Sequence, residues 1–215
     1  MCWSATADLV AGAAITSVGA ACVIRTRRAR DLPLAALPLL LGVHQLVEAW
    51  IWHTGGGTGP ATVTWAVIAL PVLALWVPVG VWCVAPRRAG RRVTALVAVG
   101  ALTAALLAHG LATRPVRAEI RGHTMAYVIG LPRAELLVAG YLIATVGALL
   151  LSGDRRLIAL GVLTGAGALV CWALWRLEFV STWCALAAVC SVVLYGWVSR
   201  RPAPKLALPA DIHRT

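Results

Sequence analysis

The sequence predicts an all-α fold, a polytopic membrane protein built as a bundle of seven transmembrane helices. The chain of 215 residues is 60% hydrophobic and 13% charged, whereas soluble domains are nearer half apolar and a quarter charged. Its apolar residues gather in runs of roughly 20, the length that a helix needs to cross a bilayer. The runs lack the alternation of strands, which favours helices. We expect the spans at Ala7–Ile24, Leu32–Trp52, Ala61–Val84, Val93–Leu111, Ala134–Leu151, Leu157–Trp175 and Phe179–Val198.

These spans occupy nearly all of the chain, so we expect one domain over residues 1–215 with a flexible cytoplasmic tail at 199–215. A cleavable signal peptide is not expected, because Met1–Ala7 carries no basic residue. Kinks are expected in the second and third spans at four prolines: Pro33, Pro38, Pro71 and Pro78. The segment Ala112–Pro132 is expected to be irregular. Its apolar part, Met125–Leu131, is interpreted either as a lid over a cavity or as an exposed connector.

The basic residues predict the orientation of the bundle. Of the 19 Lys and Arg residues, 14 fall on one side of the predicted membrane and 5 on the other. The positive-inside rule then places the N-terminus outside and the C-terminus in the cytoplasm. We expect the protein in the cytoplasmic (inner) membrane. The net charge of +11 is thus a topology signal with some attraction to membrane lipid, and no nucleic-acid partner is expected. The sequence predicts no oligomeric state.

Glu48 is the strongest single candidate for a catalytic residue. It lies inside the second span, and helical spacing places His44, Gln45 and Trp52 on or near the same face. An ionisable group at that depth costs at least ~2.5 kcal/mol, so it normally faces the bundle interior and often marks function. We expect the carboxyl group of Glu48 to be protonated unless a cation pairs with it. The alternative is an acid that only links two helices by hydrogen bonds.

Glu178 is a second candidate, in the short link between the last two spans. Helical spacing stacks Trp172, Trp175 and Glu178 along one edge, which would hold the acid at the rim of the bundle. The alternative is a solvated glutamate beside Arg176. Asp8 is interpreted as an aid to capping the first span, with a cavity-facing position as the alternative.

Most tryptophans and histidines fall in the outer half of the predicted bundle. Tryptophan is also common at both membrane surfaces, so an interfacial belt is one explanation and an aromatic-lined cavity is the other. The cavity interpretation makes eight aromatic residues candidates for substrate binding: Trp50, Trp52, Trp65, Trp172, Trp175, Trp183, Phe179 and Tyr127.

Several catalytic motifs are missing from the sequence. It contains no aspartate-rich diphosphate motif, no HExxH and no GxSxG, which argues against diphosphate ionisation, zincin chemistry and acyl hydrolysis. Scattered outer histidines leave a zinc site open as an alternative, although no i, i+4 pair supports it. We therefore expect neither a metal nor a cofactor.

Three segments carry a resemblance to known families: Met1–Ala7, His44–Trp52 and Phe179–Cys184. They resemble a group of small bacterial membrane proteins over essentially the full chain. In size, span count and placement of two acids, the sequence is also similar to the integral-membrane terpene cyclases, which include the bacterial drimentine type and the fungal meroterpenoid cyclases. In the fungal enzymes one essential acid lies in the second span and another in the last. By this resemblance, Glu48 corresponds to the first and Glu178, at the start of the last span, to the second.

The resemblance implies protonation-initiated cyclisation of a linear prenyl or farnesyl chain on an acceptor such as an indole. Glu48 would donate the proton, His44 or Gln45 would orient it, and Glu178 would take the final proton. Tryptophan faces stabilise a cation by about 0.5–2 kcal/mol each, and they exclude water. The competing interpretations are a proton-coupled small-molecule transporter or sensor and an accessory membrane protein.

Overall fold

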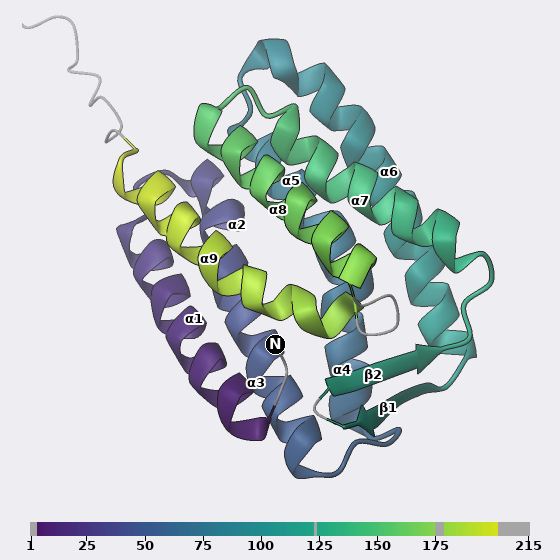
Figure 1. Ribbon diagram of the computed structural model, residues 1–215. Helices are drawn as coiled ribbons and strands as arrows, with labels where there is room; N and C mark the ends of the chain where they lie inside the picture. Colours follow the sequence, from purple (N-terminus) through teal and green to yellow (C-terminus); the bar gives the residue numbers. More distant parts are fainter. Residues whose placement is uncertain (1–3, 123, 175–178, 202–215) are drawn as a thin grey trace, which may run out of the picture.

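The computed structural model describes residues 4–122, 124–174 and 179–201, which are mostly helical (Figure 1). The helical elements follow the predicted spans closely: α1 Ala5–Arg25, α3 Leu37–His53, α4 Pro60–Val67, α5 Leu73–Val84, α6 Arg87–Thr113, α7 Ala134–Leu150, α8 Arg155–Leu174 and α9 Phe179–Ser199. A short 3-10 turn, η1 Ala29–Asp31, and one helical turn, α2 Leu32–Ala35, lead into α3. The helical part of the predicted fold class is therefore confirmed.

Among the described residues, four helical segments are long and apolar enough to cross a membrane by length and composition: Ala5–Arg25, Ala29–His53, Pro60–Val84 and Arg87–Thr113. Helix α7 and the part of α9 from Leu186 to Ser199 are apolar but shorter. These long apolar helices fit a membrane protein.

Glycines let α1 and α3 approach closely. A Cβ atom at Gly19 would lie 2.5 Å from the Cα of Leu39, and a Cβ at Gly42 would overlap Thr16 in the same way. Backbone contact of this kind is typical of small-residue packing between membrane helices. It brings the buried residues of α1 against those of α3.

Two of the four prolines lie where the second and third spans depart from a continuous α-helix, and the kinks expected at all four stay a prediction. Pro38 opens α3 directly after α2, because a proline ring fits the first turn of a helix. Pro71 lies inside a π-helical segment, η2 Ile68–Val72, between α4 and α5. Pro78 lies within α5, which continues past it.

The prediction of an irregular segment between α6 and α7 is wrong, and so is the all-α description there. Strands β1 Val116–Arg121 and β2 Thr124–Ile129 pair as an antiparallel hairpin, with Gly122 at φ 61° in its turn. The apolar–polar alternation from Val116 to Arg121 is the period-two pattern of a strand. This local signal was available in the sequence.

The helices pack side by side, and the last helix, α9, returns to contact the first, α1. Helix α3 packs on α1 and α4, α7 packs on α5, α6 and α8, and α9 returns from α8 to α1 and α3 (Figure 1). Arg25, Arg87 and Arg155 lie where α1 ends and where α6 and α8 begin; we call this the basic end. The hairpin lies at the opposite end, called here the hairpin end, with the start of α4.

Candidate functional site

The polar face of α3 is buried, as the sequence predicts. His44, Gln45 and Glu48 have side chains inside the protein, and Glu48 is 0% exposed. Glu48 lies one turn beyond the adjacent His44 and Gln45, which contact Trp65 of α4 and Asp8 of α1 respectively. Because buried polar groups are stable only with hydrogen-bond partners, their contacts define the site.

Asp8 joins this face from α1. The amide Nε2 of Gln45 donates a hydrogen bond to Oδ1 of Asp8 at 2.7 Å, and the carboxyl group is fully buried. The helix cap is instead Ser4, whose hydroxyl accepts a hydrogen bond from the backbone N–H of Ala7. Asp8 does lie in the first turn of α1, as the capping interpretation expects, and it is not in the described cavity lining, so its cavity-facing alternative stays a prediction.

Glu48 is held from the hairpin. The hydroxyl of Tyr127 donates to Oε1 of Glu48 at 3.2 Å. The Tyr127 ring stacks on Trp65 of α4, with centroids 3.4 Å apart and planes 6° apart. Trp65 also contacts the ring of His44, whose centroid lies 4.9 Å away. One aromatic stack thus connects the hairpin to the polar face of α3.

The loop after α3 fixes the hairpin over this stack. Gly57 and Ala118 exchange two backbone hydrogen bonds of 2.8 and 2.9 Å, which adds a short bridge to the edge of β1. Gly57 adopts φ 97°, a conformation that favours glycine. The guanidinium of Arg114 also donates to the carbonyl of Gly130 across the base of the hairpin.

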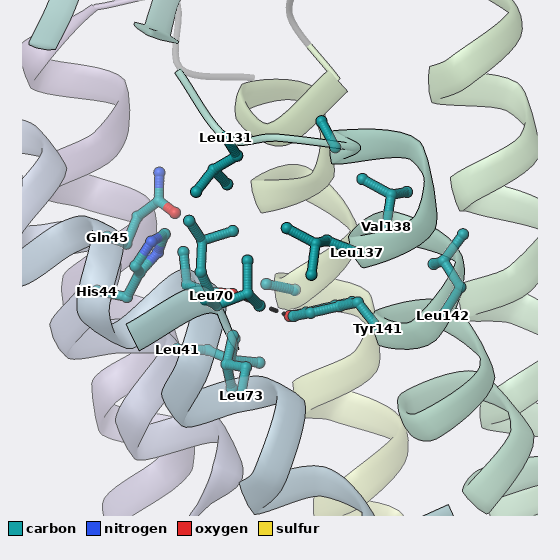
Figure 2. Close-up of a pocket in the computed structure, with 14 residues that line it drawn as sticks. Leu41, His44, Gln45, Leu70, Leu73, Leu131, Leu137, Val138, Tyr141 and Leu142 are labelled. Carbon is teal, nitrogen blue, oxygen red and sulfur yellow. Dashed lines mark hydrogen bonds between the residues drawn. The ribbon is translucent and has the colours of Figure 1, made fainter. Parts of the chain in front are cut away.

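A cavity of about 150 Å³ lies beside the polar face. Figure 2 shows His44 and Gln45 on one side and Leu137 and Tyr141 on the other. Its described lining is otherwise aliphatic: Leu41, Ala69, Leu70, Leu73, Leu107, Leu131, Ala134, Val138, Leu142 and Ala187. The lining joins α3, η2, α5, α6, α7 and α9. Val138 is 47% exposed and marks the mouth of the cavity, on α7.

The described cavity wall contains three polar side chains, Gln45, Tyr141 and His44. The hydroxyl of Tyr141 donates to the carbonyl of Ala69 at 3.0 Å, inside the π-helical segment that contains Pro71. π-Helical turns of this kind are frequent at functional sites. On the opposite side, Nε2 of His44 is buried and has no hydrogen-bond partner among the described residues. A ligand in the cavity can therefore meet an aliphatic wall and one histidine nitrogen.

The predicted tryptophans are distributed unevenly. Trp65 is buried within the stack, and Trp52 is half-buried against the same cluster. Trp50 is 60% exposed and lies outside the described cavity lining. Glu178 and Trp175 lie outside the described residues, as do the side chains of Trp172, Phe179 and Trp183. The cavity wall that the structure describes is made of leucine rather than tryptophan.

Sequence reasoning did not single out Tyr141 from other hydroxyl side chains, and it missed the leucines that line the cavity with it. Their only signal is a helical stripe, and such a stripe is typical of any packed helix. For metals, the described residues contain no group of three or more His, Cys, Asp or Glu side chains placed to hold an ion. The described site offers two buried carboxyl groups with neutral hydrogen-bond donors. Neither Asp8 nor Glu48 is in the described cavity lining, which the polar face of α3 reaches through His44 and Gln45.

Comparisons with known proteins give one match. No curated protein and no solved structure matches the chain significantly. A family model described as a family of unknown function (DUF6629) matches residues 1–209, nearly the full length. The chain therefore belongs to this family.

Proposed function

We propose that the chain crosses the inner membrane seven times, with its N-terminus outside and its C-terminus in the cytoplasm. Four helices of spanning length and the apolar α7, α8 and α9 support this topology. Large apolar side chains point outward and are more than half exposed, as lipid contact requires: Val10, Leu102, Leu136, Leu169 and Val192. Among the described residues, twelve arginines lie at the basic end and four at the hairpin end.

The proposed activity is that of a membrane terpene cyclase, which folds a linear prenyl chain and starts its cyclisation with a proton. One observation carries this proposal: the buried polar face of α3 holds the carboxyl group of Glu48, and two other residues of this face, His44 and Gln45, line an aliphatic cavity. Gln45 also binds the buried carboxyl group of Asp8. An apolar substrate in the membrane would reach the cavity through the mouth at Val138 without passing through water.

Glu48 is the proposed proton donor. Its carboxylic acid would transfer a proton to an alkene carbon of the substrate and leave a carbocation on the neighbouring carbon. The π electrons of the next double bond would then form the ring bond, and the last cation would lose a proton to a base. Glu178, outside the described residues, is the proposed base. The substrate and the product are then isomers of equal mass.

Other residues of the site would position and protect these groups. Tyr127 would orient the Glu48 carboxyl group through its 3.2 Å hydrogen bond. His44 would contact a polar atom of the substrate through Nε2, next to the aliphatic wall.

The size of the cavity limits how much of the substrate it encloses. The volume of about 150 Å³ is comparable with that of an apolar cavity that binds benzene. A farnesyl chain would therefore place its reacting end in the cavity and extend the remainder, with its acceptor group, through the mouth on α7.

The test is turnover of a linear farnesylated indole by membranes that contain the protein. We expect a new product of equal mass, and we expect Glu48→Gln to lower its rate by at least roughly 100-fold, the scale of general acid catalysis. Glu135→Gln is the matched control, because Glu135 is an exposed acid in the first turn of α7. Equal rates for Glu48→Gln and the wild type would remove the proton-donor role.

A proton-coupled transporter is the second candidate. The observation that favours it is the π-helical interruption at Pro71, whose segment contributes Ala69 and Leu70 to the cavity wall, because interrupted helices form the binding sites of many transporters. A transporter would accumulate the same compound unchanged in proteoliposomes when a pH gradient is applied. A cyclase would convert it without any gradient.

A further inference from the structure

A second hollow lies at the basic end, between the end of α1 and the end of α9. Its volume is about 410 Å³, and its described lining combines arginines with apolar and hydroxyl side chains: Ile24, Arg25, Arg27, Val198, Ser199 and Arg201. It is separate from the cavity at the hairpin end and shares no lining residue with it.

Aromatic rings of α9 hold two of these arginines in place. The guanidinium carbon of Arg25 lies 5.3 Å from the centroid of the Tyr195 ring, and that of Arg201 lies 4.2 Å from the centroid of the Trp197 ring. Trp197 is itself fixed, because its Nε1 donates to Oδ2 of Asp154 at 3.0 Å. Cations held in this way lose little conformational entropy when they bind an anion.

The arginines of the hollow outnumber the acids near them. Asp31 is buried, with Oδ2 3.7 Å from Nε of Arg201 and Oδ1 3.9 Å from Nε of Arg30. Asp154, the other described acid at this end, accepts from Trp197 and from the backbone N–H of Arg156. Within the described part of the chain, no carboxylate pairs with Arg25 or Arg27.

We propose that this hollow binds the phosphate of an anionic phospholipid in the cytoplasmic leaflet. Guanidinium groups match the geometry of phosphate oxygens and form charge-assisted hydrogen bonds with them. The apolar wall indicates a lipid rather than a free phosphate ion: Ile24 is 82% exposed beside the arginines, where an acyl chain would lie. The proposal rests on the proposed membrane topology and is independent of the cyclase activity.

The test compares two pairs of charge removals at the same end of the full chain. Arg25→Gln/Arg27→Gln changes the hollow and leaves the Arg201–Asp31 pair in place. Arg87→Gln/Arg88→Gln removes the same charge from exposed residues at the start of α6. Binding of phosphatidylglycerol and of phosphatidylcholine to the purified protein in detergent would be measured by native mass spectrometry. Thermal unfolding would confirm that each variant is folded.

We expect the wild type to retain phosphatidylglycerol over phosphatidylcholine, and the Arg25/Arg27 variant to bind phosphatidylglycerol at least roughly tenfold more weakly, since each arginine near a membrane surface contributes about 1 kcal/mol. The Arg87/Arg88 variant should bind like the wild type. If both variants lost phosphatidylglycerol binding equally, the lipid would be held by general attraction to the basic surface, and the proposed site would be overturned. Competition by inorganic phosphate at the affinity of the lipid would overturn the lipid as its ligand.

Discussion

Gln45 connects the two parts of the candidate site, because its amide contacts Asp8 and its side chain also lines the cavity. The Asp8 side chain sits on another helix, so this hydrogen bond ties α1 to α3 at the same place. Glu48 is held in a similar way by Tyr127, from a strand far away in the chain. At the scale of residues, each buried acid thus depends on a donor from a different element.

Replacement of Gln45 by leucine should destabilise the protein. The variant removes the donor that Oδ1 of Asp8 accepts from, and the loss of such a partner costs about 1–3 kcal/mol. We expect the unfolding temperature of the purified protein to fall by several degrees, at about 2–4 °C per kcal/mol for a chain of this size. The double variant Asp8→Leu/Gln45→Leu should recover part of the loss. An unchanged unfolding temperature for Gln45→Leu would contradict this account.

At the scale of elements, the approach of α1 to α3 brings the polar residues together. The glycines at 19 and 42 lie toward the basic end of this pair, and Asp8 and Gln45 lie toward the hairpin end. The hairpin then closes the site from outside the helices, through Tyr127 and through the bridge of Ala118 to Gly57.

The close packing of α1 on α3 predicts that a glycine-to-alanine substitution lowers stability at Gly19 but not at the uncrowded Gly90 of α6. Gly19→Ala should destabilise the protein by about 1–3 kcal/mol, because its Cβ would overlap the backbone of α3 at Leu39. Gly90→Ala should be neutral or stabilising by up to roughly 1 kcal/mol, because nothing lies within 4 Å of the added atom and alanine favours a helix. Thermal unfolding of both variants measures the difference. Equal stability of the two would mean that the close approach does not contribute.

The sequence predicted the helices and the polar face of α3 because both follow from local patterns. The contact between Asp8 and Gln45 could not be predicted, because it depends on which helix packs against the first turn of α1. The cavity was not predictable residue by residue, because its wall collects single side chains from separate elements. The hairpin was predictable from local sequence, because apolar and polar residues alternate along β1. The segment was interpreted as an irregular connector because of its length.

At the scale of the whole molecule, most arginines lie at one end and the candidate site lies toward the other. The basic end carries most of the described arginines and the proposed lipid site. The hairpin end carries the buried acids, the aromatic stack and the cavity. In the proposed orientation, the reaction would take place in the outer half of the bilayer.

This orientation predicts which end of the molecule reacts with a reagent that cannot cross the membrane. Arg121→Cys, next to the hairpin turn, should be labelled by an impermeant maleimide in intact spheroplasts. Arg88→Cys, at the basic end, should be labelled only after the membrane is opened. Both variants would carry alanine in place of the six native cysteines. The reverse labelling pattern would contradict the proposed topology.

The most direct test of the central proposal is turnover in D₂O. A cyclisation that begins with proton transfer from Glu48 would add one deuterium from solvent to the product, which would then be about one mass unit heavier than the substrate. We expect that product from the wild type and from Glu135→Gln, and not from Glu48→Gln. A cyclised product without deuterium, or an equally labelled product from Glu48→Gln, would contradict the assignment of Glu48 as the proton donor.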